Sequence, residues 1–341
     1  MHIVTTFFKS LALMVLALIV AGCGGGGGGA EQEVSVPPVI YSVSISAEDG
    51  GSVDTSGGNF EAGSVLQVSA TADEGFIFTQ WSDGSTENPR QLSVDSDISI
   101  TAEFLTSINL NLRVHLIKGD PWVHRSGTAM DSWVTPDDVR DQIIPELNSI
   151  WQVAGVVWEV EDVLEEAVVE YDGYLDDIKY IVDSERDDQL GQSDPNRLPL
   201  LYNLMQPSTR SVEEELDTNL FHIYIFPFIG NTSQGNAMRG FGWHSVVGSW
   251  SNKHNGGGLP EKTLLTESKS DFVRGSLSRT IAHELGHVLS LVHDCQGCLM
   301  YSSGYSFYQY QIDASREEAL RRLDNNESSG FFPDYDLHPS H

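Results

Sequence analysis

Three histidines and one glutamate lie close together near the C-terminal end of the chain, where residues 282–300 read AHELGHVLSLVHDCQGCLM. His283 and His287 are four residues apart, so on a helix they share one face, about 6 Å apart along the axis, and their imidazoles can converge on one ion. Glu284 lies to the side of that face, where its carboxylate can reach a metal-bound water. The pattern predicts a helix that carries two zinc ligands and a general base.

Two further residues extend this motif. His293 lies six residues after His287, and Met300 lies seven residues after His293. They make the motif more specific, because a bare HExxH pattern occurs by chance in roughly one chain in fifty of this length. The set resembles the metzincin metallopeptidases, whose HExxHxxGxxH pattern and methionine turn are met at every position except the glycine, which is Ser290 here. The resemblance covers about residues 108–323.

The resemblance implies a zinc endopeptidase. His283, His287 and His293 would be neutral ligands of one catalytic Zn2+, whose bound water has a pKa lowered towards about 7. Glu284 would accept the proton of that water and pass it to the leaving amine, and Met300 would lie beneath the metal without binding it.

Residues 301–310, YSSGYSFYQY, would then form a wall of the substrate pocket. Tyr301 or Tyr305 could assist the oxyanion, although an aromatic residue at such a place more often lines the pocket. Residues 236–250 have the glycines and the alternation of an exposed edge strand, against which an extended peptide can pair. His244 and His254, in or near that strand, are interpreted as structural or solvent-exposed.

Ser290 is the departure from the family pattern. The third ligand requires the chain to leave the helix and turn back, which glycine does readily because it tolerates positive φ. Serine in that conformation costs about 1 kcal/mol, which bound zinc can offset. The alternative is a longer helix and a different third ligand, Glu317 or Glu318, as in glutamate-ligand zinc peptidases.

The three cysteines have separate explanations. Cys295 and Cys298 lie between the last histidine and the methionine, where a short disulfide is favoured in an oxidising compartment. Cys23 ends the sequence VAGC, which resembles the lipobox of bacterial lipoproteins, and would be acylated; an ordinary cleaved signal is the alternative.

Residues 1–22 are interpreted as the signal peptide, because their apolar run is too short to span about 30 Å of bilayer core. Residues 23–39, which include six successive glycines, are interpreted as a flexible tether.

Residues 40–105 contain short alternating runs separated by Gly, Asp and Asn clusters, a pattern typical of antiparallel strands and tight turns. Their order resembles the divergent internalin-type B-repeat, a β-grasp-like module used as a spacer or adhesive on cell surfaces. Trp81 and Phe76 are interpreted as core residues rather than as a ligand platform.

Residues 108–323 have a mixed α and β pattern, and residues 324–341 are interpreted as a tail. Residues 108–117 alternate strictly and predict a half-buried strand on whose polar face His115 is solvated. A helix is expected from the N-cap Thr135, with a kink or break at Pro145. The expected fold class is therefore multidomain: a small β-rich module, then an α+β metzincin-like domain.

The charge balance limits the partners. With 49 acidic and 19 basic residues, the net charge of -30 disfavours binding to nucleic acid. The carboxylates are explained most simply by solubility, and scattered Ca2+ sites are a secondary interpretation. We therefore expect a lipid-anchored zinc endopeptidase of the bacterial cell envelope that acts on proteins or peptides. The alternative is a cell-surface binding protein, in which the β module holds a surface ligand and the metzincin-like domain is a degenerate scaffold.

Overall fold

The computed structural model describes residues 37–118, 134–168, 170, 172–183, 220–227, 235–238, 244–248, 277–301, 304 and 306–324. The predicted signal peptide, the tether up to residue 36, Cys23, Tyr305, His254 and the C-terminal tail from residue 325 lie outside these residues. Within the described part of the chain, no helix is both long enough and apolar enough to cross a membrane.

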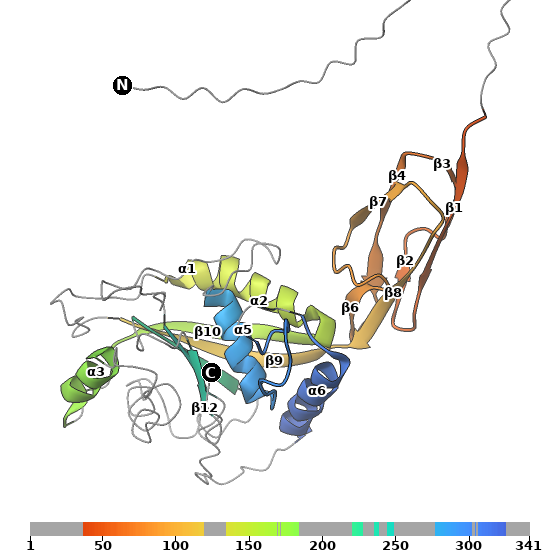
Figure 1. The fold of residues 1–341 in the computed structure, drawn as a ribbon. Coiled ribbons are helices and arrows are strands. Elements are labelled where there is room, and N and C mark those ends of the chain that lie inside the picture. The colour runs from red at the N-terminus through yellow and green to blue at the C-terminus, as the bar shows by residue number, and fades with distance from the viewer. Residues whose placement is uncertain are drawn as a thin grey trace, which may run out of the picture. The chain divides into compact units, whose positions relative to one another are not determined.

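The first described part is a β module (Figure 1). Its strands are β1 (Ile40–Ala47), β2 (Gly51–Val53), β3 (Gly57–Glu61), β4 (Ser64–Val68), β5 (Ala70–Ala72), β6 (Phe76–Trp81), β7 (Arg90–Val94) and β8 (Ile98–Thr106). One sheet has the order β3-β1-β8-β6, and β2–β5 and β4–β7 form two-stranded sheets. The pair β1–β8 is parallel and the other pairs are antiparallel. The prediction of short strands and tight turns is confirmed.

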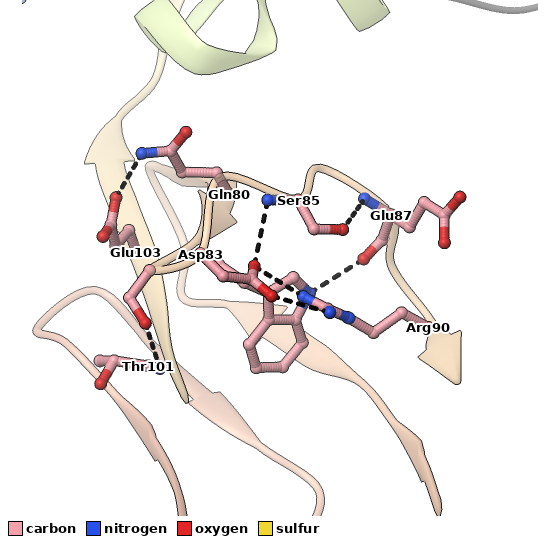
Figure 2. Close-up of polar contacts among 9 residues, drawn as sticks. Gln80, Asp83, Ser85, Glu87, Arg90, Thr101 and Glu103 are labelled. Carbon is pink, nitrogen blue, oxygen red and sulfur yellow. Dashed lines mark hydrogen bonds and ion pairs between the residues drawn. The ribbon is translucent and has the colours of Figure 1, made fainter. Parts of the chain in front are cut away.

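The interpretation of Trp81 as a core residue is confirmed, because Trp81 is fully buried. The same interpretation is wrong for Phe76, which is the first residue of β6 and keeps 38% of its surface exposed. The indole Nε1–H of Trp81 donates to the carbonyl of Glu87 at 2.9 Å, and the guanidinium of Arg90 lies 5.9 Å from the indole centroid. Arg90 also donates to both carboxylate oxygens of Asp83, at 2.8 and 2.9 Å (Figure 2). These hydrogen bonds lower the pKa of Asp83. The loop between β6 and β7 is therefore closed over the buried indole.

The second part contains a five-stranded sheet with the order β10-β9-β11-β13-β12. The strands are β9 (Ile108–Ile117), β10 (Val156–Glu166), β11 (Leu220–Phe226), β12 (Gly235–Met238) and β13 (His244–Gly248), and only β12, at one edge, is antiparallel to its neighbour among these described strands. The helices are α1 (Pro136–Asp138), α2 (Ile144–Trp151), α3 (Tyr174–Asp183), α5 (Leu277–Val288) and α6 (Gln309–Asp324). Helix α5 packs against α2, β12 and β13 (Figure 1).

The predicted helix after residue 134 begins as expected. Thr135 is the N-cap of α1, and its side chain and that of Asp138 form a capping box. The helix is not interrupted at Pro145, which lies in the first turn of α2. The irregularity comes just before it, where Val139–Ile143 form a π-helical turn. The ring of proline conflicts with the preceding helical turn, and a wider turn relieves this conflict. The apolar side chains of the π-helical turn and α2 are buried and share one core with β9 and α5: Val139, Ile143, Leu147, Ile150 and Trp151.

The prediction that His115 is solvated is wrong. The alternating apolar residues of β9 from Ile108 to Leu116 do face the core, but His115 on the opposite face is only 1% exposed. Its Nδ1 contacts the carboxylate of Glu166, its Nε2 lies 2.9 Å from Nδ1 of His222, and the ring of Tyr224 stacks on it at 4.2 Å. A polar residue in an alternating strand can thus be buried when polar groups on neighbouring strands form hydrogen bonds with it.

Candidate metal centre

Helix α5 carries His283, Glu284 and His287 in the interior of the second part. Its apolar residues Ile281, Leu285 and Val288 are at most 1% exposed and belong to the same core as β9. Glu284 is 3% exposed and His287 is 4% exposed, whereas His283 is half-buried. The helix therefore holds its polar side chains in fixed positions against a packed interior.

The structure brings the three predicted histidines together. The Nε2 atom of His293 lies 2.9 Å from Nε2 of His283 and 3.0 Å from Nε2 of His287. One ligand atom of each residue lies within 4.8 Å of the others, and no further group of this kind was found among the described residues. Three nitrogen atoms from imidazoles thus face one point, an arrangement that suits Zn2+.

The opposite ring nitrogens determine which atoms can act as ligands. His283 Nδ1 lies 2.9 Å from the carbonyl oxygen of Leu299, and His287 Nδ1 lies 2.9 Å from that of Leu291. A carbonyl oxygen only accepts hydrogen bonds, so each Nδ1 must carry the hydrogen and each Nε2 keeps its lone pair. Burial also lowers the pKa of His283 to about 3, which favours the neutral imidazole. The carbonyl contacts therefore leave Nε2 of both rings as the atom that can bind a metal, and burial favours the neutral form of His283.

Ser290 makes the turn that places His293. It has φ 69°, as expected for a residue in the position of the family glycine, and it is the non-glycine residue with positive φ among those described. The N–H of Leu291 donates to the carbonyl of Gly286 at 2.9 Å, and the N–H of Ser290 donates to that of His287 at 3.0 Å. These two bonds form a Schellman motif. The same turn points the Leu291 carbonyl at His287, so one local structure ends the helix and orients a ligand.

We expect Ser290→Gly to raise the free energy of unfolding by up to about 1 kcal/mol, because glycine adopts positive φ without a steric penalty. Zinc affinity should be unchanged or higher. Urea unfolding of the zinc-free and zinc-loaded forms measures both quantities, and Ser290→Ala controls for loss of the hydroxyl. A loss of about 1 kcal/mol in the glycine variant, as at a mid-helix position, would contradict the turn.

Met300 is fully buried below α5. A Cβ atom added at Gly286 would lie 2.5 Å from its Sδ, so the absence of a side chain at Gly286 allows the methionine to approach the helix. Gly286 has no assigned role in the motif. Its signal in the sequence is its place between His283 and His287, where a larger side chain would collide with a residue packed against the helix.

Arg279 is a second residue that the motif analysis missed. It lies one helical turn before His283 and is 6% exposed. Its Nε donates to the carbonyl of Gly304 at 2.6 Å, and its Nη2 donates to the carbonyls of Leu299 and Tyr301, the first at 2.9 Å. The carbonyl of Leu299 is thus shared between Arg279 and His283. The guanidinium fixes the segment around Met300 to the helix and orients the carbonyl that His283 contacts.

A disulfide joins Cys295 to Cys298, as predicted, with the Cα atoms 6.0 Å apart. Gln311 of α6 donates to the sulfur of Cys295 at 3.2 Å. The disulfide lies between His293 and Met300 in the chain, so it restricts the segment that connects the third histidine to the methionine turn.

The remaining predicted residues are placed as follows. Tyr301 is 43% exposed, directly after Met300. Glu317 is exposed on α6, and Glu318 binds Arg321 at 2.7 Å, so neither belongs to the histidine cluster. His244 is the first residue of β13.

Comparison with known proteins concerns the β module. Residues 41–107 match the divergent InlB B-repeat domain family. The module is a divergent InlB B-repeat domain. The matched segment ends directly before β9. No curated protein matches the chain.

Proposed function

We propose that this chain is a zinc-dependent endopeptidase of the metzincin type, exported and anchored to the bacterial cell envelope through lipid on Cys23. The observation that carries the proposal is the convergence of three Nε2 atoms, from His283, His287 and His293, at separations of 2.9 and 3.0 Å. A set of three protein ligands leaves a fourth position for water, which is the arrangement of catalytic rather than structural zinc sites.

The donor set fits zinc. Imidazole nitrogen is a preferred zinc ligand, and the two carbonyl contacts of His283 and His287 are the outer hydrogen bonds that metal-binding histidines usually make. When bound, zinc would lower the pKa of its water and polarise the substrate carbonyl.

The protein's own residues would do the remaining chemistry. Glu284, beside His283 on α5, would accept a proton from the attacking water and return it to the leaving amine. The edge strand β12 lies against α5 and could pair with an extended substrate. The sequence analysis proposed residues 236–250 as this edge; because β13 is an internal strand, the proposal now rests on β12 alone.

Metal removal tests this function. The purified chain, loaded with one equivalent of Zn2+, should cleave casein, and excess 1,10-phenanthroline should abolish the cleavage. Adding Zn2+ back should restore it, because the histidine tautomers are fixed by the protein. Cleavage that persists in the chelator with no bound metal would exclude the zinc mechanism.

The B-repeat supports a second candidate, a surface-binding protein in which the second part is a degenerate peptidase scaffold. This candidate predicts that the zinc-loaded chain cleaves no protein. The first candidate is preferred because the three histidines and the glutamate are all in place.

A further inference from the structure

The residues that follow His293 form an exposed aromatic surface. The rings of Tyr308 and Tyr310 lie 5.9 Å apart and nearly parallel, at 12°. They keep 49% and 48% of their surface exposed. The hydroxyl of Tyr310 donates to the carboxylate of Asp294 at 2.8 Å, and that of Tyr308 donates to the carbonyl of Gln296 at 3.2 Å. Both rings are therefore fixed to the segment directly after the third histidine.

The backbone beneath this pair is also fixed. The side-chain oxygen of Gln311 accepts the N–H of Tyr308 at 3.1 Å, and the N–H of Gln311 donates to the carbonyl of Tyr308 at 2.9 Å. These reciprocal bonds close the first turn of α6. The same glutamine contacts the disulfide, so the tyrosines stand on a braced turn and not on a loose loop.

The segment of chain that carries the pair has negative charge. Residues 280–315 contain no lysine or arginine, and two carboxylates lie near the pair in the chain, on Asp294 and Asp313. Both carboxylates are exposed. The first basic residue afterwards, Arg316, uses Nη1 and Nη2 to bind the carbonyls of Ala154 and Thr106. No cation within this stretch neutralises the surface.

We propose that Tyr308, Tyr310 and Asp294 form a subsite for a cationic side chain, arginine or lysine, of the substrate. Aromatic faces attract a guanidinium or ammonium group, and a neighbouring carboxylate adds a charge-assisted hydrogen bond. Asp294 directly follows His293, so a cation at this subsite lies close to the metal centre. The inference rests on the proposed function, because it takes the cation to belong to a substrate, and it assigns that substrate a basic residue.

The test measures binding, without turnover. Fluorescent decapeptides with one arginine placed at successive positions are compared with the same peptides carrying citrulline, which has the shape of arginine but no charge. The protein is the zinc-loaded full chain carrying Glu284→Gln. Fluorescence anisotropy should show about tenfold tighter binding of the arginine peptide at one position or more, with a preference that decreases as salt is added.

Matched variants locate the preference. It should fall to within about twofold in Asp294→Asn and in the double variant Tyr308→Leu and Tyr310→Leu. The double variant with phenylalanine at both positions keeps the rings and should keep most of the preference. Equal zinc content in all variants excludes damage to the metal site as the cause of a lost preference. Glu317→Gln removes one negative charge from an exposed position of α6 outside the subsite, and it should leave the preference unchanged.

Two results would overturn the subsite. One is equal binding of arginine and citrulline peptides at every position, and the other is an undiminished preference in the leucine double variant. The proposed function is judged separately, by casein cleavage with the wild-type chain. A preference for arginine without any cleavage would keep the subsite and reject the peptidase.

Discussion

Glu284→Gln is expected to lower the rate of casein cleavage by about 10²- to 10⁴-fold while zinc stays bound at one equivalent. Glutamine has nearly the size of glutamate, so the packing of the buried side chain in α5 should be kept. The amide cannot accept the proton of the attacking water, so the attack loses its base. Initial rates and metal content measured on the same preparation separate a chemical loss from a loss of the metal.

The matched control for this change is Glu317→Gln, an identical substitution at an exposed position of α6, which should leave the rate unchanged. Equal rates in wild type and Glu284→Gln would remove the glutamate from the mechanism. No cleavage by either form with zinc bound would favour the surface-binding protein.

His293→Ala is expected to abolish zinc binding at micromolar metal. His293 contributes the nitrogen that lies within 3.0 Å of both other ligand atoms, and its loss leaves two imidazoles. The decrease in affinity should exceed the 10- to 100-fold that accompanies loss of a second-shell partner. Competition with a chromophoric chelator measures this affinity, and far-ultraviolet circular dichroism verifies the fold.

The comparison for this variant is the double substitution Glu317→Ala and Glu318→Ala, which removes the alternative third ligand. It should keep zinc at wild-type affinity per folded molecule. Loss of the Glu318 ion pair with Arg321 can reduce stability, so the fraction of folded protein must be measured beside the metal. Zinc retained in His293→Ala and lost in the double variant would reverse the assignment of the ligand.

Much of this architecture could be predicted because its determinants are local. The strict alternation of residues 108–117 gave β9, Thr135 and Pro136 gave the start of α1, and the spacing of His283 and His287 gave their common face. The conformation of Ser290 was predictable for the same reason, since a ligand six residues beyond His287 requires the chain to turn back.

The remaining features could not be predicted because they depend on partners distant in the sequence. His115 is buried because its two ring nitrogens form hydrogen bonds with Glu166 and His222, which lie on two neighbouring strands. Arg279 is buried because carbonyls about twenty residues later converge on its guanidinium. No periodicity within a single segment contains this information, and a polar residue read locally is assigned to solvent.

The two carbonyl acceptors behind His283 and His287 have a consequence for how freely this sequence can vary. Main-chain oxygens are present whatever residue occupies positions 291 and 299, so exchange of Leu291 or Leu299 for another apolar residue of similar volume removes no anchor from the ligands. What must be kept instead is the route of the backbone, which depends on the positive φ of Ser290, and the space at Gly286 that Met300 approaches. The geometry of the site thus also depends on residues that contribute no ligand atom. Among those residues, we expect substitutions to be tolerated least where the chain bends.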